Sequence, residues 1–166
     1  MNIRTTTRNA ALAALVSVAT LLVQVPVPAT QSYIHLGDAA IIAGALLFGA
    51  RSGLIAGGIG SVLADILGGY AHWAPFTLII KGLEGFLVGL IAARTGTRMG
   101  IRTLIAATSG GVTVVAGYFL VETTLYGSEA ALIAALPNTI QALSGMVAGV
   151  ATAAAPKQGR QAQFTT

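Results

Sequence analysis

The chain has 166 residues, of which 55% are hydrophobic and only 8% are charged, and its mean hydropathy is +0.81. A soluble domain carries about 25% charged residues, and a chain of this length has too little interior to bury so much apolar surface, so a soluble fold is excluded. The absence of cysteine excludes disulfides, thiolate metal sites and cysteine nucleophiles. The net charge is +4, but its distribution marks membrane topology and not a nucleic-acid surface.

The length suits about six membrane-spanning helices of ~20 residues with short connections. Hydropathy and the prolines and glycines between apolar segments place the predicted spans at 8–25, 34–49, 52–68, 75–93, 101–124 and 137–155. A short interfacial helix with Ser128 as its N-cap is expected before the last span, which begins at Pro137. We therefore expect an all-α integral membrane protein in which residues 1–166 form one compact bundle of six transmembrane helices.

The first apolar segment has two interpretations. Its basic start and apolar core are also typical of a cleaved signal peptide. The stretch that follows, VQVPVPATQS, offers no clear small-x-small cleavage site. This favours a retained first span.

The basic residues define the orientation of the predicted bundle. An even number of spans places both termini on one side of the membrane. Every lysine and arginine except Lys81 falls on that side: Arg4, Arg8, Arg51, Arg94, Arg98, Arg102, Lys157 and Arg160. By the positive-inside rule, we expect both termini to be cytoplasmic, in the cytoplasmic membrane of a bacterium or archaeon.

Small residues recur at four-residue spacing, which lets helix backbones approach closely in lipid. Packing within one bundle is the simpler explanation, and a surface for a partner membrane protein is the alternative. The second fits best at Ala10 and Ala14 in the first helix, where Ala13 widens the patch. The glycines in this pattern are Gly49, Gly53, Gly57, Gly85, Gly89, Gly145 and Gly149.

Polar side chains collect in the outer half of the predicted bundle. Lys81 lies about 9 Å into the fourth helix from outside, and Glu84 about 4.5 Å deeper on the same face. Glu122 lies near the outer end of the fifth helix, with Tyr118 one turn deeper. The cytoplasmic half has almost only aliphatic residues and glycine, whereas a channel needs polar groups along its whole length. The pattern predicts a cup that is open or lidded on the outside and sealed below.

We expect this cup to bind a small molecule. Lys81 and Asp65 each have two interpretations. They contact the ligand, or they are structural, with Lys81 in an ion pair with Glu84 or Asp65. Trp73 and Tyr126 are either interfacial aromatics or a lid over a ring-shaped ligand. The predicted substrate-binding residues are Glu84, Glu122, Asn138, Gln141, Tyr118, Trp73 and Lys81.

Motifs of enzymes and of energy-coupled pumps are missing from the sequence. It has no GxxxxGK[ST] phosphate loop, no GxSxG and no HExxH. His35 and His72, both in outer loops, make a weak metal site. The inverted repeats of secondary transporters are not visible either. We expect no enzymatic activity, no cofactor and no bound metal.

Four stretches in order resemble the substrate-binding S components of energy-coupling factor (ECF) vitamin transporters: YIHLGDAAIIAGALLFGARSGLIAGGIGSVLADIL, GYAHWAPFTLIIKGLEGFLVGL, GYFLVETTLYG and LPNTIQALSGMVAG. They are most similar to the branch that includes predicted transporters of hydroxymethylpyrimidine, pyridoxine and related precursors. The resemblance implies a six-helix bundle that captures a vitamin from outside. It also implies partners, namely a transmembrane coupling subunit and two ATPase subunits, and a toppling motion that turns the site inward.

The resemblance implies a coupling surface at the single Ala-x-x-x-Ala pair of the first helix, Ala10 and Ala14. We therefore expect the substrate-capture subunit of an ECF-type ABC importer. A stand-alone transporter or facilitator for a small polar metabolite and a non-transport membrane scaffold are the alternatives. A co-purifying ligand excludes the scaffold, and co-purifying ATPase subunits separate the importer from the stand-alone transporter.

Overall fold

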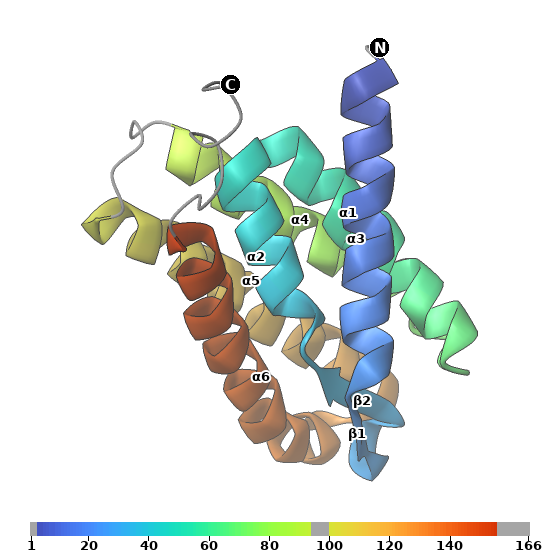
Figure 1. Ribbon diagram of the computed structural model, residues 1–166. Coiled ribbons are helices and arrows are strands. Elements are labelled where there is room, and N and C mark those ends of the chain that lie inside the picture. The colour runs from blue at the N-terminus through green and yellow to red at the C-terminus, as the bar shows by residue number, and fades with distance from the viewer. Residues whose placement is uncertain (1–2, 94–99, 156–166) are drawn as a thin grey trace, which may run out of the picture.

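The computed structural model describes residues 3–93 and 100–155, in which six α-helices form a bundle (Figure 1). An antiparallel hairpin joins the first two helices, with β1 (Gln24–Val27) paired to β2 (Ser32–His35) around the short 3-10 helix η1 (Pro28–Thr30). The helices are α1 (Ile3–Leu22), α2 (Gly37–Phe48), α3 (Ala50–Leu67), α4 (Ala74–Ala93), α5 (Ile101–Tyr126) and α6 (Ser128–Ala154).

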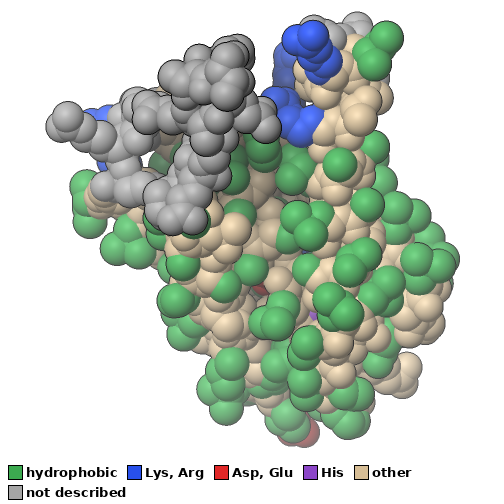
Figure 2. Space-filling model, in the orientation of Figure 1, with side chains coloured by type: hydrophobic (Ala, Val, Ile, Leu, Met, Phe, Trp, Pro, Cys, Tyr) green, Lys and Arg blue, Asp and Glu red, His purple; other side chains and the backbone are tan. Residues whose placement is uncertain are grey.

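The outer surface of the bundle is apolar. Large aliphatic side chains such as Leu67 and Val147 are more than two-thirds exposed, and hydrophobic side chains cover much of the described surface in Figure 2. By length and composition, α3, α4, α5 and α6 are able to cross a membrane, and α2 is a shorter apolar helix. The protein is therefore a multi-pass membrane protein, while the expected total of six spans stays a prediction.

Two elements differ from the sequence-based expectation. The hairpin was not predicted; it forms because Tyr33 and His35 alternate with half-buried neighbours, a period-two pattern only four residues long. The separate interfacial helix at Ser128 is wrong, since α6 continues through Pro137. Its buried face keeps the helical period on both sides of the proline, through Ala134 and Asn138. Packing of that face outweighs the one backbone hydrogen bond that proline removes.

Glycines bring the helices into close contact within the bundle. A Cβ at Gly53 would overlap the carbonyl of Gly85, so α3 and α4 meet backbone to backbone. Gly145 similarly lets α6 lie against Asp38 at the start of α2. Gly49 differs, because its φ of +86° serves the turn between α2 and α3. Most of the four-residue glycine spacing thus serves packing inside the bundle.

The two ends of the bundle are chemically different. At one end, Arg8 of α1 donates a hydrogen bond to Ser52 of α3 (3.2 Å) and lies over the Phe48 ring. Lys and Arg side chains gather where α1 begins (Figure 2), and the hairpin lies at the opposite end (Figure 1). Arg94, Arg98, Lys157 and Arg160 lie outside the described residues.

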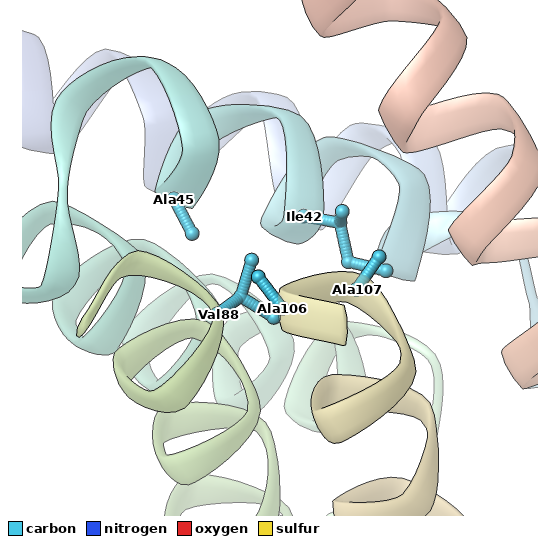
Figure 3. Packing of buried hydrophobic residues seen from close by; sticks show 5 residues of the cluster. All are labelled: Ile42, Ala45, Val88, Ala106 and Ala107. Atoms are coloured by element: carbon cyan, nitrogen blue, oxygen red, sulfur yellow. The ribbon is translucent and has the colours of Figure 1, made fainter. Parts of the chain in front are cut away.

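An apolar core closes the arginine end of the interior. It joins α2, α4 and α5 through small and branched side chains (Figure 3). Val88 of this core lies one helical turn beyond Glu84 in α4. The polar residues of α4 therefore end where the apolar core begins, as expected for a cup with a sealed floor. The cluster consists of Ile42, Ala45, Val88, Ala106 and Ala107.

Candidate functional site

A small cavity lies among the hairpin, α3, α4, α5 and α6. Its volume is about 20 Å³, close to the room that a single water molecule needs. The lining combines carboxylates, amides and aromatic rings, and it contains no lysine or arginine among the residues that the structure describes. The lining residues are Ser32, Tyr33, His35, Asp65, Trp73, Thr77, Tyr118, Glu122, Asn138 and Gln141.

One wall of the cavity is a carboxylate held by an amide. Glu122 of α5 is fully buried, and the amide nitrogen of Asn138 in α6 donates to both of its oxygens, at 3.2 and 3.1 Å. A carboxylate offers about four acceptor positions. The single amide nitrogen uses only part of this capacity, which leaves Glu122 able to accept further hydrogen bonds from the cavity.

A second wall is aromatic. Trp73 is 2% exposed, and its indole nitrogen donates to the carbonyl of Gln31 in the hairpin turn (3.0 Å). Its ring meets Tyr118 edge-on, with centroids 5.8 Å apart, and stacks with Tyr126 at 6.0 Å. Trp73 therefore lies inside the bundle and not in an interfacial belt facing lipid. These rings supply flat apolar surface next to the polar wall.

Asp65, near the end of α3, forms a third part of the lining. The phenol of Tyr33 donates to its Oδ1 atom at 2.7 Å. Burial, with the nearby Asp65 carboxylate, raises the pKa of Tyr33, so the phenol keeps its proton and acts as the donor. Of the two ion-pair partners expected for Lys81, the structure shows Glu84 and not Asp65, and it adds Asp38.

Lys81 belongs to a buried charge network beside the cavity. Its ammonium lies 2.5 Å from Asp38 in α2 and 3.3 Å from Glu84, and all three side chains are almost completely buried. Gln141 extends the network, since its amide donates to Asp38 (3.0 Å) and accepts a hydrogen bond from the backbone N–H of His35 (2.9 Å). The network thereby connects α2, α4, α6 and the hairpin.

His35 adds no positive charge to the cavity. Burial lowers its pKa to about 4, so the imidazole is neutral at physiological pH. Its Nδ1 atom accepts a hydrogen bond from the Gly37 N–H (3.0 Å), which fixes the tautomer. The fixed charges that line the cavity are therefore the carboxylates of Asp65 and Glu122.

Five of the seven predicted substrate-binding residues line the cavity, and two do not. Lys81 and Glu84 lie in the charge network and do not line the cavity. Sequence reasoning did not pair Lys81 with Asp38; an acid in the first turn of an apolar helix, at the depth of a buried lysine, was the available signal. The predicted residues that line the cavity are Trp73, Tyr118, Glu122, Asn138 and Gln141.

The small residues predicted to form one patch on α1 differ in their exposure. Ala10 and Ala14 are exposed on the outer face of the helix. Ala13 is 5% exposed and turns inward, where its carbonyl limits the space at Gly60. Ala13 therefore packs inside the bundle and does not widen the exposed patch, contrary to expectation.

Comparison with known proteins identifies the family. The family described as "ECF-type riboflavin transporter, S component" matches residues 1–157. The chain belongs to the S components of ECF-type transporters. This S component is 32% identical over 147 residues to the thiamine precursor transporter HmpT of Lactococcus lactis subsp. cremoris, which covers 88% of this chain and 83% of HmpT. It is also 45% identical over 134 residues to a Pyrococcus woesei protein described as "Uncharacterized protein in gap 3'region", covering 81% and 88% of the two chains.

The family membership confirms the resemblance found in the sequence. As an ECF S component, the chain is the substrate-binding subunit of a transporter. The family is one of transporter subunits and not of enzymes. The polar cavity at the hairpin end is the candidate for its substrate site.

Proposed function

We propose that this S component captures a thiamine precursor, or a closely related small heteroaromatic vitamin, from the outer side of the cell membrane. The main observation that supports this proposal is a cavity lined by the Glu122–Asn138 pair and by the rings of Trp73 and Tyr118. Such a site suits a flat ring with polar substituents, because the rings provide apolar contact and the carboxylate and amide fix its orientation. The relationship to a thiamine precursor transporter supports the same substrate class.

The charges of the cavity favour a neutral or cationic substrate. Asp65 and Glu122 line it, His35 is neutral, and the ammonium of Lys81 is occupied by the carboxylates of Asp38 and Glu84. An anionic phosphate or carboxylate group would be buried beside like charges, which costs free energy. The cavity has room for about one water molecule, so entry of any ring requires the lining side chains to separate.

Delivery of the substrate requires partners. In our proposal, a transmembrane coupling subunit and two ATPase subunits associate with the cytoplasmic half of the bundle. Ala10 and Ala14 are exposed on α1, where small side chains allow a partner helix to approach closely. In our proposal, the end of the bundle where α1 begins faces the cytoplasm, because Arg8 and Arg51 lie there.

Mass spectrometry of the detergent-purified S component tests the substrate. A co-purifying aminopyrimidine or related ring supports the proposal, and its affinity follows from the fluorescence of Trp73, which is the single tryptophan of the chain and lines the cavity. A tightly bound ligand of another chemical class would contradict it. Recovery of the complete transporter with ATPase subunits separates this importer from a stand-alone transporter.

A further inference from the structure

One oxygen of Asp65 is buried without a hydrogen-bond partner. The side chain lies in the last turn of α3, is 3% exposed and lines the cavity. Its Oδ1 atom accepts the Tyr33 phenol, whereas Oδ2 meets no donor among the residues that the structure describes. A buried carboxylate oxygen without a donor destabilises the protein unless something else supplies one.

The neighbouring side chains make no hydrogen bond to Oδ2 in the described structure. The hydroxyl of Thr77, which is next to Asp65, lies 3.2 Å from the phenol of Tyr118, and either of these two groups can be the donor. The ammonium of Lys81 lies between Asp38 and Glu84. Tyr33 already donates its single proton, and its ring packs on Tyr70 with centroids 4.3 Å apart. Because Asp65 lines the cavity, a ligand bound there can supply the donor that Oδ2 lacks.

Asp65 and Glu122 belong to different parts of the cavity wall. Asp65 comes from α3, whereas Glu122 and Asn138 come from α5 and α6. A ring held between them would present one edge to the Asp65 carboxylate and another edge to the Glu122 carboxylate and the Asn138 amide. Hydrogen-bonding sites reject ligands that lack the matching group, because the buried protein atom then stays unpaired.

We propose that Asp65 is a specificity-determining residue, whose free oxygen accepts a hydrogen bond from an amino group of the substrate. The inference rests on the proposed function and narrows its substrate class to amino-substituted heteroaromatic rings. A ring of similar size that lacks a donor at this edge leaves the oxygen unpaired. Asp65 thereby distinguishes between vitamins that fit the same aromatic walls.

The test titrates Trp73 fluorescence with two ligands, 4-amino-5-hydroxymethyl-2-methylpyrimidine and the same ring without its amino group. We expect the native protein to bind the amino compound roughly ten- to a hundredfold more tightly. Asp65→Asn keeps an acceptor for Tyr33 but presents an amide donor to the ligand. It should lower the affinity for the amino compound by a similar factor, and change the affinity for the other ring by less than about threefold.

Two controls make the result decisive. Glu129→Gln makes a matched change at an exposed glutamate and should leave both affinities unchanged. Thermal unfolding in detergent shows whether each variant is folded. If Asp65→Asn fails to fold, the relative affinity of the native protein for the two rings tests the proposal.

Equal binding of the two rings by the native protein would overturn the role of Asp65, and so would equal loss of both in a folded Asp65→Asn protein. Either outcome leaves the proposed capture of a small ring intact. Failure of the native protein to bind either ring is a different result, which contradicts the proposed function and this inference together.

Discussion

At the scale of single residues, the buried charges are explained by their mutual contacts. Lys81 is in a helix that is apolar enough to span the membrane, where an unpaired charge is costly. Asp38 and Glu84 neutralise it, and Asp38 also accepts from Gln141. Glu84 has the weaker geometry, at 3.3 Å from the ammonium, and neither of its oxygens has a hydrogen-bond partner in the described structure. The two carboxylates are therefore not equivalent.

Lys81→Met should destabilise the protein by roughly 3–5 kcal/mol, because it leaves two buried carboxylates without their cation. Glu84→Gln should have little effect, since the Lys81–Asp38 contact persists and one excess buried charge is removed. Thermal unfolding of the detergent-solubilised protein measures both changes. Arg51→Met, which removes a charge at an exposed position, is the matched control. A Glu84→Gln protein as unstable as Lys81→Met would show that the triad acts as one unit.

Glu122 and Asn138 face the cavity together, and their variants should affect binding more than folding. Glu122→Gln keeps an acceptor for Asn138, and Asn138→Ala removes only the amide. Each should weaken vitamin binding roughly ten- to a hundredfold, because one polar group of the ligand loses its partner. Fluorescence titration of Trp73 measures the affinities, with the exposed Glu129→Gln as the control. Unchanged affinity in both variants would place the substrate elsewhere.

At the scale of helices and strands, the sequence predicted best what local patterns determine. The predicted spans at 75–93 and 101–124 correspond to α4 (Ala74–Ala93) and α5 (Ile101–Tyr126), because each is a long apolar run with proline or glycine near its ends in the sequence. The hairpin was not predicted because each strand has only four residues, which is too short for a period-two pattern to be recognised. Pro137 indicated a helix start, but the continuous buried face of α6 prevailed.

In the candidate site too, contacts between neighbouring helices could be predicted from the sequence, and a contact between distant helices could not. Glu122 and Asn138 are 16 residues apart across one tight turn, so their proximity follows from two consecutive antiparallel helices. Lys81 meets Asp38 across 43 residues, a contact that depends on how α2 is rotated against α4. That rotation is set by packing at glycines such as Gly53 and Gly145. Sequence periodicity indicates the buried face of a helix, but not the helix that covers it.

The exposed face of α1 is where we expect the coupling subunit to bind. Replacing Ala10 or Ala14 with Trp should block the approach of a partner helix, so vitamin uptake by cells should fall severalfold. Affinity of the isolated S component should stay nearly unchanged, because both side chains point away from the bundle interior. Ala116→Trp makes the same change on exposed α5 and is the control. Equal loss of uptake and binding would show that Ala10 and Ala14 serve internal packing.

At the scale of the whole molecule, charge is separated along the bundle axis. Arg8 and Arg51 lie at the end where α1 and α3 begin, and the acidic cavity lies near the opposite end, beside the hairpin (Figure 1). The apolar core around Val88 closes the interior between them. A continuous polar path, which a channel requires, is interrupted by this core. In our proposal, the substrate is held at one end of the bundle, so its release requires a larger movement of the subunit.

Orientation in the membrane is therefore the property on which the proposed capture from outside depends, and it is directly measurable. The natural chain has no cysteine, so a single cysteine is labelled without background. His72 is exposed in the turn between α3 and α4 at the cavity end, and Arg51 is exposed at the other end. On intact cells, a membrane-impermeant maleimide should label His72→Cys at once, and Arg51→Cys only after the membrane is permeabilised. The cysteine-free protein is the control for background. The reverse pattern would place the cavity on the cytoplasmic side, where it could receive a substrate from the cell but could not capture a vitamin from outside.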